Sequence, residues 1–194
     1  PNQGHLAISQ LEKYKQVKVI TQNIDGLHQL AGSSQVYQIH GSLFETVYSA
    51  QERKRLLSQA EMRQLLDQLC QVFSSSFALP KILDSVSSLF GFDELGFHYP
   101  NVVLFGQAVS EPDWSLAEEA IQKCDCLIVA GTSGTVYPAS SLPLIASKSG
   151  AKIIEIGMEH GLSGIWLKGK SGKILPRLVE AVSKITPTGS SREK

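Results

Sequence analysis

Three short runs of apolar, mostly β-branched residues place the strongest limit on what this chain can fold into. They lie at residues 17–20, 126–130 and 152–156. Runs of this length and composition are typical of buried β-strands. Helical patterns precede the second and third runs, at 113–123 and 139–147, and residues 101–105 form a fourth candidate strand. Because strands and helices alternate, the sequence predicts an α/β fold with a doubly wound parallel sheet.

Residues 46–99 interrupt this alternation. Ser58-Gln59-Ala60-Glu61 is a capping-box pattern, and apolar residues then recur at three-to-four spacing as far as Phe73, which predicts one amphipathic helix. A second short helix is expected at 84–90, before a loop at 91–100. We therefore expect a small, mainly helical inserted module. The predicted boundaries are 1–45 and 100–186 for the main domain, 46–99 for the module, 175–185 for the last helix and 187–194 for a frayed tail.

Charge and cysteine content narrow the class of protein. Lys+Arg and Asp+Glu each number 18, so the chain has no net field to attract nucleic acid or an anionic membrane. No apolar run reaches the roughly 18–20 residues that span a bilayer, and the first residues show no signal-peptide pattern. The three cysteines, Cys70, Cys124 and Cys126, do not suggest a disulfide framework. We expect a soluble protein of a reducing compartment such as the cytoplasm, with no nucleic-acid or membrane partner.

Polar residues gather directly after two of the predicted strands, where a doubly wound sheet binds its ligands. Residues 21–28 contain amides and a carboxylate at a strand-to-helix turn. Residues 131–138 combine glycines and hydroxyls before a helix, which suits a phosphate or a ribose. Each segment also has a purely structural interpretation: Asp25 could cap a helix, and Gly-Thr-Ser-Gly occurs in ordinary strand-to-helix turns. Taken singly, the two patterns leave both interpretations open.

Four segments together resemble the signature motifs of the sirtuin family, in the family's order. They are residues 21–28, 39–42, 101–107 and 130–139. The resemblance runs from Pro1-Asn2-Gln3-Gly4-His5 to Leu175-Pro176-Arg177-Leu178 and fades only in 46–99; in motif it is closest to the bacterial and mitochondrial class. It implies a Rossmann-like NAD-binding domain. It also implies an enzyme that uses NAD to remove acyl groups from protein lysine side chains, giving nicotinamide and O-acyl-ADP-ribose.

The resemblance also implies roles for individual residues. His40 would be the catalytic base, which suits a side chain whose ordinary pKa is near neutrality. Asn23 and Asp25 would hold the nicotinamide and the reacting ribose. The implied cofactor-binding residues are Gln22, Asn23, Ile24, Asp25, Gly131, Thr132, Ser133, Gly157, Met158 and Ser171. An acylated lysine peptide would lie as an added strand between two edges formed by Phe105, Gly106 and Gln107 and by Gly134, Thr135 and Val136. Val103 and Phe105 would line the acyl-lysine tunnel.

Several features depart from the family pattern. Sirtuins usually bind a structural zinc with two Cys-x-x-Cys pairs, but Cys70 is the only cysteine between Gly41 and Pro100, so we expect no metal. The glycine-rich diphosphate loop and first strand of the family precede the Pro-Asn-x-x-His segment with which this sequence opens. We therefore expect a fragment of a longer enzyme, inactive alone, or a degenerate homologue. Gly157 stands where the family commonly has Asn, and Gln107 where it has Glu.

Two alternative functions stay open beside the deacylase. A sirtuin-like NAD glycohydrolase or ADP-ribosyltransferase would use the same Asn23, Asp25 and His40 without a peptide groove. A catalytically dead NAD- or ADP-ribose-binding module would explain the missing cysteines and loop. The retained Phe105-Gly106-Gln107 edge favours the deacylase, and the retained base argues against a module that only binds.

Overall fold

The computed structural model describes residues 1–48, 53–73, 91–93, 96–104 and 106–185. The chain forms two compact units. The first comprises Pro1–Gln22, Leu27–Ile39 and Glu111–Lys194, and the second comprises Asn23–Gly26 and His40–Ser110. The predicted helix at 84–90 and the predicted tail at 187–194 lie outside the described residues.

The strands of the first unit are all parallel. Strand β1 (Val19–Thr21) pairs with β2 (Val36–Gln38). A second set pairs in the order β7-β8-β9 and comprises β7 (Cys126–Ala130), β8 (Lys152–Gly157) and β9 (Ile165–Lys168). Within the described residues these two sets are separate sheets. The predicted parallel α/β architecture is confirmed, and the first strand begins two residues later than its apolar run.

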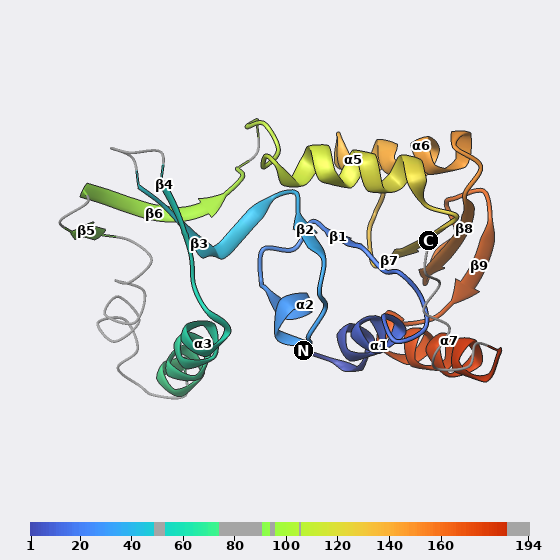
Figure 1. The fold of residues 1–194 in the computed structure, drawn as a ribbon, viewed down its shortest axis with the longest axis horizontal. Coiled ribbons are helices and arrows are strands. Elements are labelled where there is room, and N and C mark those ends of the chain that lie inside the picture. Colours follow the sequence, from blue (N-terminus) through green and yellow to red (C-terminus); the bar gives the residue numbers. More distant parts are fainter. Residues whose placement is uncertain (49–52, 74–90, 94–95, 105, 186–194) are drawn as a thin grey trace, which may run out of the picture. The chain divides into compact units, whose positions relative to one another are not determined.

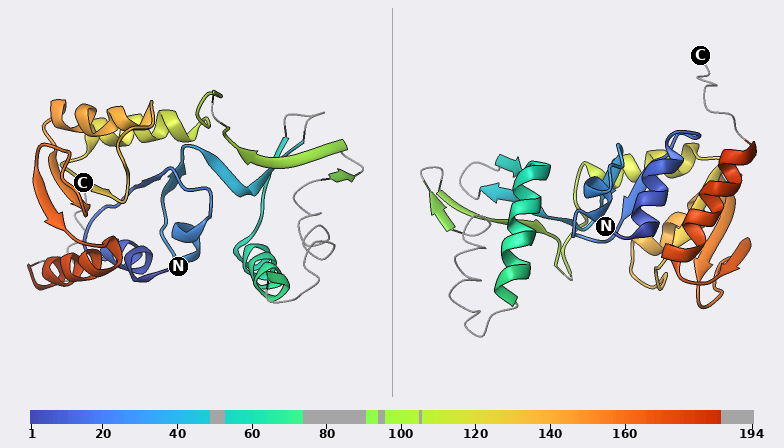
Figure 2. Two further views of the ribbon diagram at one scale, coloured as in Figure 1. Left: turned by 180° about the vertical axis from the view of Figure 1, so that it is seen from behind. Right: turned by 90° about the horizontal axis from the view of Figure 1, so that it is seen from below.

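Helices cover both faces of β7–β9 (Figure 1). They are α1 (Gln3–Leu11), α5 (Asp113–Lys123), α6 (Leu142–Lys148) and α7 (Ser171–Ile185), with the short α2 (Leu27–Leu30) beside β1 and β2. Figure 2 shows from behind that α5 and α6 lie on one side of these strands and α1 and α7 on the other. The α1–α7 side has a core in which Ala7, Leu11, Ile156, Leu175 and Val179 are buried. This layering leaves the strand ends as the accessible edge of the sheet.

The helix predictions are largely confirmed, with two boundary corrections. Helix α5 covers the predicted range. The predicted helix at 139–147 is a 3₁₀ turn, η1 (Ala139–Ser141), followed by α6. The last helix begins at Ser171 rather than Leu175, so Pro176 lies inside it. Proline inside a helix is unusual because it lacks the N–H that an interior residue donates. No helix among the described residues is long and apolar enough to cross a membrane.

The second unit contains an antiparallel sheet that the sequence did not predict. Its strands are β3 (Gly41–Tyr48), β4 (Arg53–Leu56), β5 (Gly91–Asp93) and β6 (Gly96–Val102), in the order β4-β3-β6-β5. The expected loop at 91–100 is therefore wrong, and the expectation of a mainly helical module missed this sheet. A proline such as Pro100 normally argues against a strand, because it cannot donate a hydrogen bond to the neighbouring strand. Here Pro100 pairs with Thr46 at a register shift, where the pairing of β3 and β6 is already irregular.

The predicted helix of the module is confirmed as α3 (Gln59–Phe73). The Ser58 hydroxyl accepts a hydrogen bond from the Glu61 amide at 3.3 Å, and the Glu61 carboxylate accepts one from the Ser58 amide at 2.8 Å. This is the predicted capping box. Both bonds lower the pKa of Glu61, and the bond with the Ser58 backbone has the larger effect.

Candidate active site

In the first unit, two predicted site segments meet at the carboxyl edge of the strands. Gln22 follows β1 and Thr132 follows β7, and the Gln22 Nε2 atom donates to the Thr132 Oγ1 atom at 3.3 Å. These residues are 110 positions apart in sequence. The structure thus brings together two segments that were predicted to share one ligand-binding edge.

The turn after β7 is an open polar loop. Gly131 and Gly134 both have left-handed backbones, with φ of 69° and 66°, and a Cβ atom on either would meet nothing within 4 Å. The Thr132 hydroxyl accepts from the Gly134 amide at 3.2 Å, and the Ser133 and Thr135 hydroxyls lie 2.8 Å apart. The whole turn, including Val136, is exposed. Successive amides in left-handed turns form a concave donor surface of the kind that binds phosphate, so the turn fits the phosphate or ribose predicted for it.

The ends of β8 and β9 carry the other predicted cofactor residues. The Gly157 carbonyl accepts from the Gly169 amide at 3.0 Å and from the Trp166 Nε1 atom at 3.3 Å. Met158 is 60% exposed, and Ser171 is the first residue of α7. The Gly157 carbonyl is therefore bonded within the protein, whereas the exposed Met158 is accessible to a ligand at this edge.

In the second unit, the segment Asn23–Gly26 is fixed against β3 and α3. The Leu43 amide donates to the Ile24 carbonyl at 3.0 Å. Gly26 is left-handed, with φ of 62°, and a Cβ atom there would lie 2.7 Å from the Met62 Cε atom. Asn23 is exposed, whereas Ile24 and Asp25 are half-buried. Gly26 therefore lies close to the Met62 and Phe44 side chains, and the bond from Leu43 ties this segment to β3.

His40 is held by its neighbours on both sides. Ile39 is fully buried, and the His40 carbonyl accepts from the Val103 amide at 3.0 Å. Gly41 has φ of 77°, and a Cβ atom on it would lie 2.0 Å from the Asn101 carbonyl oxygen. Only glycine fits there, so β6 fixes the backbone of the predicted base, whose side chain is half-buried.

The predicted peptide edge after β6 is a turn. Gly106 is left-handed with φ of 89°, and the Gln107 side-chain oxygen accepts from the Leu104 amide at 2.8 Å. Gln107 therefore folds back to stabilise its own turn. Val103 is half-buried, and Phe105 lies outside the described residues.

Within the described ranges, no three His, Cys, Asp or Glu side chains are grouped as a metal site would require. Cys70, Cys124 and Cys126 are not in disulfides. Burial first, and then the charge of Asp125, raises the pKa of both Cys124 and Cys126. Protonated thiols are poor metal ligands and poor nucleophiles. The expected absence of zinc stays a prediction.

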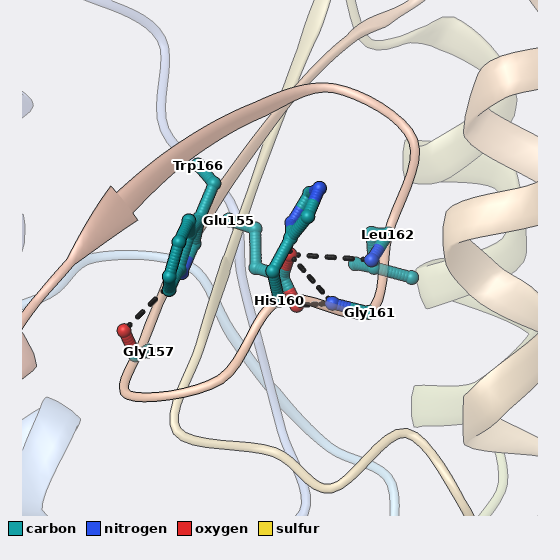
Figure 3. A network of polar contacts seen from close by, with 6 residues as sticks. All are labelled: Glu155, Gly157, His160, Gly161, Leu162 and Trp166. Atoms are coloured by element: carbon teal, nitrogen blue, oxygen red, sulfur yellow. Dashed lines mark hydrogen bonds and ion pairs between the residues drawn. The ribbon is translucent and has the colours of Figure 1, made fainter.

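One polar cluster near the carboxyl edge of β8, centred on Glu155, was not predicted from the sequence (Figure 3). His160 joins this cluster through its bond to Glu155, and Trp166 joins it by stacking on the His160 ring. The one available signal was a carboxylate between two isoleucines, Ile154 and Ile156, in a predicted strand.

Comparison with known sequences gives a consistent set of relatives. The sequence model of the Sir2 family matches residues 1–138. The "NAD-dependent protein deacylase 2" of Pyrobaculum aerophilum is 37% identical over 189 residues, which are 95% of this chain and 67% of the relative. The "NAD-dependent protein deacylase" of Pyrococcus furiosus is 35% identical over 191 residues, or 96% of this chain and 70% of the relative. The chain thus spans about two thirds of the length of these relatives.

Solved structures show the same likeness. A Sir2 homologue in complex with NAD superposes with a TM-score of 0.74 at 30% identity, covering 95% of this chain and 66% of that one. Sir2Af2 bound to a myristoylated histone peptide gives a TM-score of 0.72 at 32% identity, covering 95% of this chain and 73% of that one.

Proposed function

This chain belongs to the Sir2 family, as its four motifs predict, and we propose that it is an NAD-dependent protein-lysine deacylase that uses His40 as its general base. One observation carries the assignment of the base. His40 sits between a fully buried Ile39 and a glycine that is packed on the β6 backbone. A general base must keep a fixed position to accept a proton in the transition state, and these two packed neighbours fix the backbone of His40.

NAD fits the residues on the carboxyl edge. The Gly131–Gly134 turn presents exposed, left-handed backbone beside Thr132, which is joined to Gln22. We assign the phosphates and the adenosine ribose to this turn. Bound NAD supplies a ribose carbon that releases nicotinamide and takes up the oxygen of the acyl-lysine.

The nicotinamide end is assigned to Asn23 and Asp25. An ionised aspartate accepts hydrogen bonds from the carboxamide NH₂ group, and an asparagine can both donate and accept. The backbone that carries them is fixed at Ile24 and Gly26. This support would hold the two side chains in place while the bond to nicotinamide breaks. His40 then accepts a proton from the ribose 2′-hydroxyl.

The substrate proposed is an acylated lysine in a peptide or protein. Sir2Af2, which is 32% identical, was solved with a myristoylated histone peptide. In this chain, Gly106, Gly134, Thr135 and Val136 are exposed. Exposed backbone of this kind can pair with an extended peptide, a mode of recognition that depends little on peptide sequence.

The test is His40→Ala in the full-length protein, assayed with NAD and acetyl-, succinyl- and myristoyl-lysine peptides. Loss of the base should lower turnover about 10²–10⁴-fold, with NAD affinity by calorimetry nearly unchanged. A variant that deacylates at the normal rate would remove His40 from the mechanism. An unmutated protein that hydrolyses NAD briskly but ignores every acyl-lysine peptide would instead be a glycohydrolase.

A further inference from the structure

Glu155 is a charged residue in the middle of β8. Its neighbours Ile154 and Ile156 pack into the core formed by α1 and α7, so strand alternation directs the Glu155 side chain to the opposite face of the sheet. That side chain is only 14% exposed. Withdrawing a carboxylate from water is costly unless hydrogen bonds replace the lost hydration. The partners of Glu155 therefore define its role.

Those partners come from residues 158–164, the loop between β8 and β9 (Figure 3). The Gly161 amide donates to both carboxylate oxygens at 3.1 Å, and the Leu162 amide donates to one at 3.2 Å. The His160 Nδ1 atom lies 2.8 Å from the same carboxylate. Burial alone raises the pKa of Glu155, but the Gly161 amide, His160 and the Leu162 amide outweigh it, so the pKa lies below that of an ordinary glutamate. Glu155 is thus an anion that fastens this loop to the strand.

A second contact closes the loop against β9. Trp166 is the register partner of Glu155 across the parallel pair, and the His160 ring stacks on the Trp166 ring with 5.2 Å between centroids and 22° between planes. The Trp166 Nε1 atom also donates to the Gly157 carbonyl at 3.3 Å. The start of the loop is therefore held at Gly157 and its tip at Glu155.

The position of this loop gives the cluster a function. It follows β8 at the carboxyl edge, and β8 is paired with β7, whose following turn contains Gly131–Gly134. We propose that Glu155 is a positioning residue for NAD: by anchoring residues 158–164 it holds the backbone at Gly157 and Met158 in the shape that receives the adenosine part. This inference rests on the proposed function, which assigns NAD to this edge. A loop that is ordered in advance loses less entropy when the ligand binds.

A change at Glu155 is predicted to affect NAD binding and the chemical step differently. Asn23, Asp25 and His40 belong to the other compact unit, and they are not among the residues of the Glu155 cluster drawn in Figure 3. Loosening the loop should therefore weaken NAD binding and leave the chemical step intact. A purely structural role would lower stability without this division between KM and kcat.

The experiment compares Glu155→Gln with Glu159→Gln in the full chain. Both changes remove one negative charge near the loop, but Glu159 is an exposed residue of the loop itself. Glu155→Gln replaces one acceptor oxygen with an NH₂ group that faces the loop amides. We expect it to raise the calorimetric Kd and the KM for NAD about tenfold, with kcat at saturating NAD within about twofold. Hydrogen exchange at Gly161 and Leu162 should accelerate in this variant alone.

His160→Phe provides a second variant in case Glu155→Gln does not fold. It keeps a ring to stack on Trp166 and removes the bond to Glu155, so NAD affinity should fall about threefold. Normal NAD binding by both folded variants overturns the inference and leaves the proposed deacylase intact. Weakened NAD or ADP-ribose binding in a protein that deacylates no peptide supports the inference and refutes the proposed function. An unmutated full-length protein that binds neither NAD nor ADP-ribose refutes both.

Discussion

The turn after β7 and the segment around His40 both depend on left-handed glycines, but for different reasons. At Gly131 and Gly134 a Cβ atom would meet nothing within 4 Å, so glycine is favoured only by its backbone conformation. At Gly26 and Gly41 the backbone is also left-handed, and a Cβ atom would overlap a neighbour at 2.7 Å and 2.0 Å. The first region is open and the second is closely packed.

The difference matches what each region is proposed to do. A loop that binds phosphate or ribose must leave space above its amides for the ligand. A segment that carries a general base must hold the base still, and close packing on both sides of the backbone achieves this. The same residue type thus provides access at one site and rigidity at the other.

The largest expected effect is on Gly41. Gly41→Ala adds the strain of a left-handed alanine to a collision with the Asn101 carbonyl, so the free energy of unfolding of its unit should fall by about 3 kcal/mol. Urea denaturation measures this change. Gly106→Ala is the matched control in the same unit, because Gly106 is left-handed with nothing near its Cβ position. Equal destabilisation by the two variants would show that the packing at Gly41 is not what makes this region rigid.

A smaller effect is expected at Gly131. Gly131→Ala should cost about 1 kcal/mol in the free energy of unfolding, from left-handed strain alone. NAD affinity should fall as well, because the new methyl group enters the open space above the turn. Gly150→Ala is the control: Gly150 has φ of 90° with nothing within 4 Å, and it precedes β8 at the opposite edge. If calorimetry finds equal NAD affinity in the two variants, the turn after β7 is not part of the NAD site.

No effect is expected from chelation. If the rigidity of the second unit comes from strand pairing and from Gly26 and Gly41, removal of metal ions by EDTA should leave its unfolding midpoint unchanged. Elemental analysis of the purified protein gives the parallel measurement of bound zinc. Stoichiometric zinc, or unfolding on chelation, would mean that a metal contributes to that rigidity.

The fold of the first unit could be predicted because its signals are local. Apolar runs of strand length, separated by helical patterns, specified β1, β7, β8 and α5 within one or two residues, whereas the shorter β2 and β9 were not predicted. The capping box at Ser58 and Glu61 specified the start of α3 in the same way. Strand β5 was missed, and the strand predicted at 101–105 overlaps β6 only at Asn101 and Val102, because Gly91, Gly96 and Pro100 are residues typical of loops.

The candidate site was predicted in part. The position of residues after strands placed Gln22 and Thr132 at one edge, and the hydrogen bond between them agrees with that placement. Glu155 was missed because its partners are backbone amides of Gly161 and Leu162, which carry no sequence signal. Any residue other than proline would offer the same donor.

The sequence by itself determined the parallel α/β architecture, the family and the residues that could bear the chemistry, since these follow from periodicity and motif. The tertiary structure alone decided which glycines are required by space, that Gln107 binds its own turn, and that Glu155 anchors a loop. The reason is physical: whether a Cβ atom at Gly41 collides with Asn101, or a carboxylate finds donors, depends on chain segments brought together only by folding.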